Sequence, residues 1–380
     1  MRVLPRPIFD YIDGGSDDEI ALRRSTTAFD DIEFLPRSLV DISNPQHSIE
    51  IFGKRIPFPL LLSPTGLTAL FHRDAESAVA RAAGEAGLPY CLSTLGNTTI
   101  EDFAAACTGP KLFQIYIFKD RGLTEEFVQR AKASGYAGLI LTVDTLVPGK
   151  RERDIASGLK LPPQLTPRAF LEFARRPKWS LPALFGNKFE FVNVAHRAAG
   201  LSGQKMSLVD YIGGQFDRSV SWKDVEWLAE KWGGPLAVKG LVTGKDARTA
   251  VNSGADTIYV SNHGGRQLET CVPPIRQIAD VADAVSGQAK IVCDGGIRRG
   301  THIVKALAMG ADACSVGRAY LYGLAAGGQS GVARAIAILR EEYERTMTLL
   351  GAASPRELDR TMLTAPNAEI PMTSGGRRES

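Results

Sequence analysis

The sequence predicts a (β/α)8 TIM barrel, and three observations support this fold class. Eight short runs rich in Val, Ile, Leu and Phe recur along the chain. Segments with helical periodicity separate many of these runs, and polar residues stand at the carboxyl end of nearly every run. An open doubly wound sheet is the alternative, but such a sheet gathers its polar residues at one switch point.

Each apolar run is short enough for a strand and apolar enough to be buried on both faces. The eight predicted strands lie within residues 57–64, 88–94, 111–117, 138–144, 235–240, 256–262, 290–296 and 312–318. The predicted helices share a periodic apolar face and a late glycine, and they cover residues 74–87, 124–135, 222–234, 244–254 and 300–310.

Two segments depart from this repeat. Residues 1–56 form an N-terminal extension with a short helical stretch that ends at DGGSDD. Residues 145–220 form a long insertion after the fourth strand, over the predicted active face, and a segment of this length must be functional or partly helical. We expect one barrel domain over residues 1–366 and a disordered tail over residues 367–380.

The insertion is basic and aromatic. Residues 160–210 contain eight Lys or Arg against three Asp or Glu, interleaved with Trp179, Phe185, Phe189 and Phe191. Basic and aromatic residues together are typical of a surface that contacts a membrane. A lid over the site, or a contact between subunits, explains the pattern equally well.

Composition excludes several classes of protein. Hydrophobic residues make up 44% and charged residues 23%, which indicates a globular chain rather than a disordered one. The net charge of +3 argues against a dedicated nucleic-acid binder. No apolar run is long enough to span a bilayer, and the N-terminus does not resemble a signal peptide. The five cysteines show no CxxC spacing, which predicts buried thiols in a reduced, cytoplasmic chain without a metal site.

The motif SNHGGRQ follows the predicted sixth strand and contains two candidate site residues. His263 can take a proton near neutral pH, and Arg266 presents a planar fork suited to a carboxylate. Asp144 ends the fourth strand, where it can either accept a hydrogen bond from a histidine or cap a helix. Arg151 is a second cation close to Asp144 in sequence, although a surface position is the ordinary interpretation of an isolated arginine.

Three further polar residues stand in or near apolar strands. Gln114 needs a hydrogen-bond partner in such surroundings, and a ligand amide or carbonyl would serve. Tyr116 can donate to a substrate oxygen or simply pack. Lys239 lies near the end of the fifth strand, and a buried lysine is uncommon unless an anion faces it.

Glycine and arginine follow the last two predicted strands. DGGIRRG occupies residues 294–300 after the seventh strand, and Gly317 and Arg318 follow the eighth. Barrels frequently bind phosphate with these two loops, because glycine lets backbone N–H groups approach the anion and arginine adds charge-assisted bonds. The pattern predicts a phosphate site that fits a phosphorylated cofactor, and neither a Walker loop nor a complete GxGxxG motif is present.

Together these motifs resemble the FMN-dependent 2-hydroxy acid oxidising family. The resemblance extends from about Pro7 to about Leu358 and rests on SNHGGRQL, LTVDT with GKRERD, FQIYIFKDR, LAVKG, DGGIRRGTHIVKALAMGAD and VGRAYLYGLAA, in the family's order. The family includes glycolate oxidase and lactate oxidase. Its flavoprotein L-lactate and (S)-mandelate dehydrogenases are the most similar, through YIDGGSDDEIALRRS, SPTGL and GRAYLYGLAA.

The resemblance implies a role for each matching position. The implied catalytic residues are a base, its carboxylate partner, a tyrosine facing the substrate hydroxyl and a lysine beside the flavin: His263, Asp144, Tyr116 and Lys239. The implied partners of the substrate carboxylate are Arg151, Arg266 and Tyr11. The positions that match flavin contacts are Pro64, Thr65, Gly66, Ser93, Gln114, Thr142 and Ser261. The positions that match the ribityl-phosphate site are Asp294, Gly295, Gly296, Arg298, Gly317 and Arg318.

The activity implied by the resemblance is oxidation of an (S)-2-hydroxy acid, L-lactate or a mandelate-like acid, to the 2-oxo acid with FMN as cofactor. Electrons are expected to pass to a quinone or another carrier. The resemblance also implies a homotetramer, and peripheral contact with the cytoplasmic face of a membrane through residues 160–210. An oxidase that passes electrons to O2, another phosphate-binding barrel and a non-catalytic flavin-binding barrel are the alternatives.

Three departures from the family pattern refine these expectations. Leu95 stands where glycolate oxidase has Trp, which leaves room for a larger substrate side chain. Gly66 stands where several oxidases have Ala, which favours a dehydrogenase. The family usually has a further helix before IFDYIDGG, so the N-terminus is expected to be truncated.

Overall fold

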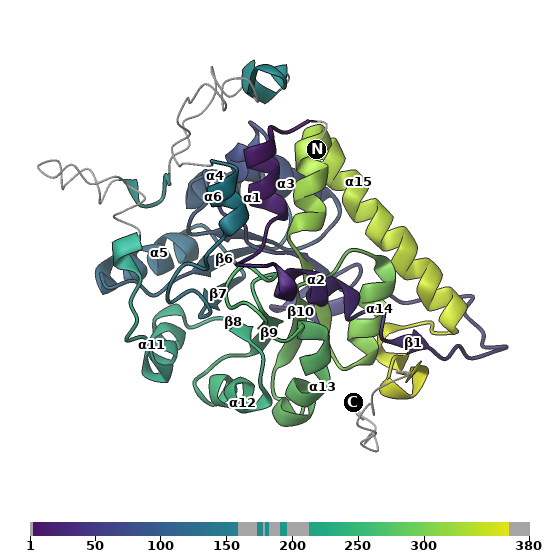
Figure 1. Cartoon of the computed structure of the whole chain (residues 1–380). Helices are drawn as coiled ribbons and strands as arrows, with labels where there is room; N and C mark the ends of the chain where they lie inside the picture. The colour runs from purple at the N-terminus through teal and green to yellow at the C-terminus, as the bar shows by residue number, and fades with distance from the viewer. Residues whose placement is uncertain (1–2, 159–172, 178, 182–190, 196–212, 365–380) are drawn as a thin grey trace, which may run out of the picture.

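The computed structural model describes residues 3–158, 173–177, 179–181, 191–195 and 213–364, and it contains a closed barrel of eight parallel strands (Figure 1). The strands are β4 (Leu60–Leu62), β5 (Tyr90–Ser93), β6 (Lys111–Ile115), β7 (Gly138–Thr142), β8 (Leu236–Leu241), β9 (Thr257–Ser261), β10 (Lys290–Asp294) and β11 (Ala313–Val316). Seven lie within the predicted runs, β8 extends one residue beyond its run, and β11 closes the barrel against β4. The predicted (β/α)8 fold is confirmed, and the open sheet is wrong.

Helices surround the barrel, and all five predicted ones are present (Figure 1). They are α3 (Ala75–Glu85), α5 (Arg121–Ala133), α11 (Trp222–Trp232), α12 (Gly244–Asn252) and α14 (Gly300–Ala308). The sequence analysis did not identify α4 (Ile100–Ala106), α13 (Pro274–Val285) and α15 (Arg318–Leu350). Gly327 and Gly328 have non-helical dihedral angles, and they divide α15 into two helical parts.

The N-terminal extension contributes helices and a hairpin. Its elements are α1 (Arg6–Asp13), α2 (Ile20–Thr27), β1 (Glu33–Phe34), β2 (Ile49–Ile51) and β3 (Lys54–Ile56). The remaining short elements are η1 (Thr68–Leu70), α6 (Glu152–Ala156), η2 (Pro355–Glu357), η3 (Arg360–Met362) and β12 (Leu363–Thr364), the last of which pairs with β1. Helix α1 packs against α6, the first helix of the long insertion (Figure 1).

The hairpin of β2 and β3 closes the amino-terminal end of the barrel. Ile51, Phe52 and Ile56 belong to the same buried cluster as the side chains inside the barrel. The ring of Phe52 lies against Gly138, at the start of β7, where a Cβ atom would come within 2.5 Å of the ring. Apolar side chains therefore fill this end of the barrel, and they leave the opposite end for the site.

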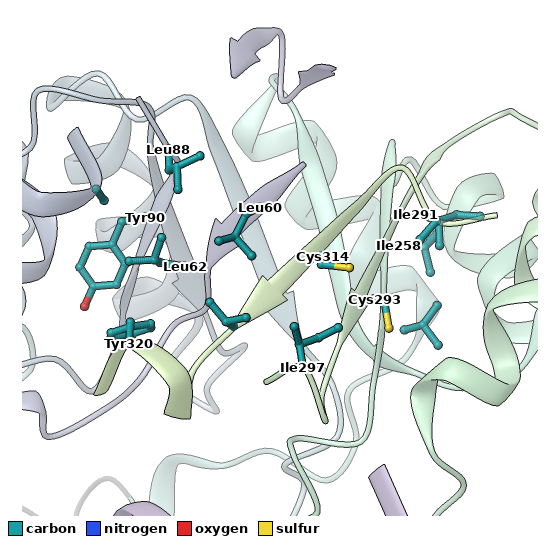
Figure 2. Packing of buried hydrophobic residues seen from close by; sticks show 14 of the residues in the cluster. Leu60, Leu62, Leu88, Tyr90, Ile258, Ile291, Cys293, Ile297, Cys314 and Tyr320 are labelled. Carbon is teal, nitrogen blue, oxygen red and sulfur yellow. The ribbon is translucent and has the colours of Figure 1, made fainter. Parts of the chain in front are cut away.

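Apolar side chains on the barrel strands belong to two separate clusters. Those outside pack under the helices, and Figure 2 shows Leu62 beside Tyr90 and Tyr320, and Cys314 near Cys293. Those inside are Leu61, Cys91, Leu112, Ile140, Ala237, Tyr259, Val292 and Ala313.

A layer of polar side chains lies above the inner apolar cluster. Residues two apart on a strand share a face, so the position two residues beyond each inner apolar residue also points inside the barrel. We call these buried positions the polar layer: Ser63, Ser93, Gln114, Thr142, Lys239, Ser261, Asp294 and Ser315. Six of them were predicted from the sequence, and Ser63 and Ser315 were not.

In the described parts of the chain, no helix combines the length and the apolar character needed to cross a membrane.

Replacement of Phe52 by Ala tests the role of the hairpin. The Phe52 side chain is 5% exposed among the inner barrel residues, so its truncation should lower the free energy of unfolding by about 3–5 kcal/mol in urea denaturation. Lys54→Ala, on the exposed side of the same hairpin, is the matched control and should change it by no more than about 0.5 kcal/mol. Equal effects of the two substitutions would mean that the hairpin does not close the barrel.

Candidate active site

A cavity of about 430 Å³ opens at the carboxyl ends of the barrel strands. Except for Asp144 and Ser261, every site residue predicted from the sequence lines it. The lining residues among those predictions are Tyr11, Pro64, Thr65, Gly66, Ser93, Gln114, Tyr116, Thr142, Arg151, Lys239, His263, Arg266, Asp294, Gly295, Gly296, Arg298, Gly317 and Arg318. Asp144 and Ser261 contact two of them, His263 and Lys239.

The first functional unit of the cavity is an imidazole–carboxylate pair. His263 Nδ1 lies 3.0 Å from Asp144 Oδ1. Burial raises the pKa of Asp144, but the charge and hydrogen bond of His263 and the charge of Lys239 hold that pKa below its usual value. The ionised carboxylate accepts the proton on Nδ1, which leaves Nε2 as the free nitrogen of the ring. This arrangement suits His263 to take a proton from a group in the cavity.

Two guanidinium groups flank one aromatic ring beside this pair. The guanidinium carbons of Arg151 and Arg266 lie 5.2 and 5.0 Å from the ring centroid of Tyr11. Arg266 Nη1 donates to the backbone oxygens of Tyr11 and Gly14, and Arg151 Nε donates to Asp154 Oδ2 at 2.8 Å. These bonds fix both guanidinium groups at the cavity wall and use only some of their N–H groups, so the rest can bind a carboxylate.

The loop after β10 and the start of α15 form a second cationic region. Gly295 and Gly296 have φ values of 123° and 77°, and a Cβ atom at Gly296 would lie 1.8 Å from the backbone oxygen of Ser25. Gly317 is the N-cap of α15 and Arg318 is its first residue. A helix N-terminus beside glycine-rich backbone is suited to bind an anion.

Arg318 lies at the centre of a group of partly buried cations. It donates through Nε, Nη1 and Nη2 to the backbone oxygens of Ile12, Gly264 and Gly14, at 2.8–2.9 Å. Burial and the neighbouring charges of Arg266 and Arg298 lower the pKa of Arg318 to about 9. Burial also lowers the pKa of Arg298 and of Arg266. Cations that destabilise one another in this way would be stabilised by an anion, so the region fits a phosphate group.

A buried histidine supports the backbone of this region. The ring of His302 stacks on Phe29, with 4.3 Å between the centroids, and its Nδ1 lies 3.3 Å from both the backbone oxygen of Gly296 and the backbone nitrogen of Arg298. Burial lowers the pKa of His302 to about 4. The sequence analysis missed this residue, because its position inside a helix indicates only packing.

The polar layer forms the floor of the cavity. Lys239 Nζ lies 3.0 Å from Asp294 Oδ2 and 2.9 Å from Ser261 Oγ. Gln114 Oε1 accepts from Ser93 Oγ at 3.0 Å, whereas Gln114 Nε2 is buried and has no partner among the residues that the structure describes. An unpaired amide donor in the cavity lining fits a carbonyl oxygen of a bound ring.

Several side chains that line the cavity are apolar, and we call them the apolar wall: Leu67, Phe71, Leu95, Phe191 and Phe216. Leu95 and, as part of the insertion, Phe191 were named from the sequence, whereas the other three were not. They lie outside the barrel strands, where an apolar residue carries no local signal of function.

Two aromatic residues of the insertion face the barrel. Phe191 is buried at the cavity, and Trp179 Nε1 donates to the backbone oxygen of Leu70 at 2.8 Å. Phe185 and Phe189, which belong to the predicted membrane-contact segment, lie outside the described residues, as does the predicted tail beyond residue 366.

A family model described as FMN-dependent dehydrogenase matches residues 1–365. The chain belongs to this family. Among similar proteins, the L-lactate dehydrogenase of Alcaligenes faecalis is 40% identical over 364 residues, with 96% of each chain covered. An L-lactate dehydrogenase of Vibrio cholerae serotype O1 is 42% identical over 364 residues, with 95% of each chain covered.

Solved structures agree with this assignment. The monotopic membrane protein (S)-mandelate dehydrogenase has a TM-score of 0.89 and 35% identity, with 96% of each chain covered. Mandelate oxidase with (S)-2-phenylpropionate has a TM-score of 0.79 and 34% identity, with 95% of this chain and 94% of that chain covered. The predicted family is therefore confirmed, and with it FMN as the cofactor.

His302→Gln tests whether the buried imidazole makes this FMN-dependent protein sensitive to acid. The folded chain holds His302 neutral with a pKa of about 4, whereas the ordinary pKa of a histidine is 6.5. Between these two pKa values the unfolded chain binds a proton at His302 and the folded chain does not. The folded state therefore loses stability as the pH falls from 6.5 towards 4. The melting temperature should depend more steeply on pH in the wild type than in the His302→Gln variant. Thr301→Ala, at the residue next to His302 on α14, should keep the wild-type slope. A variant as steep as the wild type would contradict this.

Proposed function

We propose that the protein oxidises an (S)-2-hydroxy acid, L-lactate or a mandelate-like acid, to the 2-oxo acid. The observation that carries this proposal is that the His263–Asp144 pair, the two arginines on Tyr11 and the phosphate-binding region all meet at one cavity. The names of the relatives, L-lactate dehydrogenase and mandelate dehydrogenase, support the substrate class. When bound, FMN supplies the group that accepts the two electrons.

Three groups of residues would hold FMN. Arg298, Arg318 and the backbone at Gly295, Gly296 and Gly317 would bind its phosphate. The polar layer would meet the ring and the ribityl chain through Ser93, Gln114, Thr142, Ser261 and Asp294, and the segment of Pro64, Thr65 and Gly66 would border it. Lys239 would place its positive charge beside the ring, where a cation favours the reduced, anionic form.

The arginines and the histidine would act on the substrate. Arg151 and Arg266 would hold its carboxylate beside Tyr11, so that the hydroxyl-bearing carbon is fixed in one orientation. His263 Nε2 would take a proton from the substrate as it is oxidised, and the carboxylate of Asp144 would stabilise the imidazolium that forms. Burial raises the pKa of Tyr116, so its hydroxyl would stay protonated and could donate to the substrate oxygen.

His263→Gln should separate catalysis from binding. A general base contributes roughly 10²–10⁴ to the rate, so kcat should fall by about that factor while FMN content and the flavin absorbance spectrum stay unchanged. His72→Gln, at a histidine that does not line the cavity, is the matched control and should keep wild-type turnover. Turnover that survives the loss of His263 would instead favour a flavin enzyme that uses another base.

The apolar wall favours an acid with an apolar side chain. Leu95 and Phe71 belong to this wall, and Phe71 stacks on Tyr11, the ring that the two arginines flank. An apolar side chain of the acid could therefore contact the wall while the arginines hold its carboxylate. Anaerobic reduction of the flavin by glycolate, L-lactate, (S)-mandelate and longer acids measures the preference directly. We expect L-lactate or (S)-mandelate to bleach the flavin faster than glycolate does, and Leu95→Trp to slow mandelate more than lactate. A loaded protein that none of these acids bleaches would refute the proposal.

We propose a quinone or a similar carrier as the electron acceptor, with peripheral membrane contact through residues 160–210. Gly66 supports a dehydrogenase, because the family resemblance associates glycine at this position with dehydrogenases and alanine with several oxidases. An alanine Cβ atom there would lie 3.2 Å from both Leu95 Cβ and the Leu95 backbone oxygen. The similar (S)-mandelate dehydrogenase is described as a monotopic membrane protein. Turnover with a soluble quinone analogue should exceed oxygen uptake measured with the same acid. Oxygen uptake and peroxide formation at matching rates would select the oxidase.

A further inference from the structure

Only two side chains of the polar layer carry a charge, and they form an ion pair. Lys239 on β8 is 4% exposed and Asp294 on β10 is 6% exposed. Lys239 Nζ lies 3.0 Å from Asp294 Oδ2. Ser261, on the strand between them, accepts from Lys239 Nζ at 2.9 Å and donates to Asp294 Oδ2 at 2.7 Å. The three side chains therefore form a closed triangle beneath the cavity.

The carboxylate of Asp294 is fully engaged within this layer. Its Oδ1 atom accepts from Ser63 Oγ at 2.5 Å, and Ser63 in turn contacts Ser315 Oγ at 2.6 Å. Hydroxyl donors on both carboxylate oxygens favour the ionised form. In agreement, the pKa of Asp294, which burial raises, is held below its usual value by Lys239 and by the hydrogen bonds from Ser63 and Ser261.

A buried lysine cannot keep its charge without such a partner. Desolvation favours the neutral amine, and buried lysines with a pKa as low as about 5–6 are known. The titratable groups that face Lys239 are Asp294 on β10, Asp144 after β7 and Cys91 on β5. Asp144 is engaged by His263, and Cys91 is a buried thiol, so Asp294 is the anion in direct contact with the ammonium group. Burial lowers the pKa of Lys239, yet Asp294 and, more weakly, Asp144 hold it above its usual value.

We propose that Asp294 is the counter-ion that keeps Lys239 charged beneath the flavin, and is thus a positioning residue for the electrostatics of electron transfer. This rests on the proposed location of Lys239 beside the FMN ring. The charge at Lys239 favours the anionic reduced flavin only while its proton is retained. Asp294 would therefore determine the pH range over which the flavin keeps a high reduction potential.

The test compares FMN-loaded wild type with Asp294→Asn, which keeps the size of the side chain and removes its charge. The readouts are the midpoint potential of the flavin and its affinity for sulfite, an anionic probe that adds to electron-poor flavins, between about pH 6 and 9, where a buried lysine without a partner loses its proton. In the variant, both the midpoint potential and the sulfite affinity should fall with rising pH more steeply than in the wild type. At about pH 9, sulfite should bind the variant about tenfold or more weakly than it binds the wild type. Parallel pH profiles in the two proteins would overturn the proposal.

Further variants separate this role from loss of contact with the cofactor. Asp294→Glu keeps the charge and should restore the wild-type pH profile. Lys239→Met should lower the potential at every pH, and adding Asp294→Asn to it should introduce no further pH dependence. If Lys239→Met leaves the potential unchanged, the proposed place of Lys239 is wrong. If only Asp294→Asn has no effect, the counter-ion role alone is wrong.

The apoprotein offers a second measurement if Asp294→Asn does not retain FMN. Without its counter-ion, the buried lysine is neutral in the folded chain and charged in the unfolded chain, so stability should be lost as the pH falls. The melting temperature of the Asp294→Asn apoprotein should therefore fall, relative to that of the wild-type apoprotein, as the pH is lowered from about 9 to 6. The same pH dependence in both apoproteins would refute the role.

Discussion

This site depends on one constraint, which is that side chains alternate between two faces on eight strands closed into a barrel. Because alternate residues share a face, the inner apolar residues are followed on each strand by a buried polar one. The hairpin around Phe52 fills the amino-terminal end, so the cavity forms only at the carboxyl end. The site is thus built on rigid strands, and its loops add charge and shape to a floor that the barrel already fixes.

The end of a single N-terminal helix connects the two cationic parts of the cavity. Arg266, beside the proposed substrate, donates to the backbone oxygens of Tyr11 and Gly14. Arg318, at the proposed phosphate, donates to those of Ile12 and Gly14. The carbonyl end of a helix carries the negative pole of its dipole, so it stabilises cations that repel each other. The N-terminal extension is therefore part of the site, although it lies outside the barrel.

Two carboxylates, Asp144 and Asp294, each pair with a different functional group of the site. Each has a specific partner 3.0 Å away, the imidazole of His263 for the first and the ammonium group of Lys239 for the second. Burial alone would raise both pKa values, and the paired group holds each one below its usual value. The pairs belong to different layers, one at the cavity wall and one in its floor. A proton can therefore be taken up at His263 while the charge under the flavin is maintained separately.

The sequence alone predicted the eight strands, because each is an apolar run buried on both faces. Strand-end positions indicated His263, Lys239 and the glycine–arginine loops, whereas most of the other proposed contacts came only from the family resemblance. The sequence did not indicate Ser63 and Ser315, the stacked His302 or the position of Phe71 at the cavity. These features depend on contacts between distant segments. Ser16, for example, meets the backbone of Gly265 across 249 residues. Local pattern determines which residues are buried, whereas only barrel closure and the docking of the N-terminal helices decide which of them share one cavity.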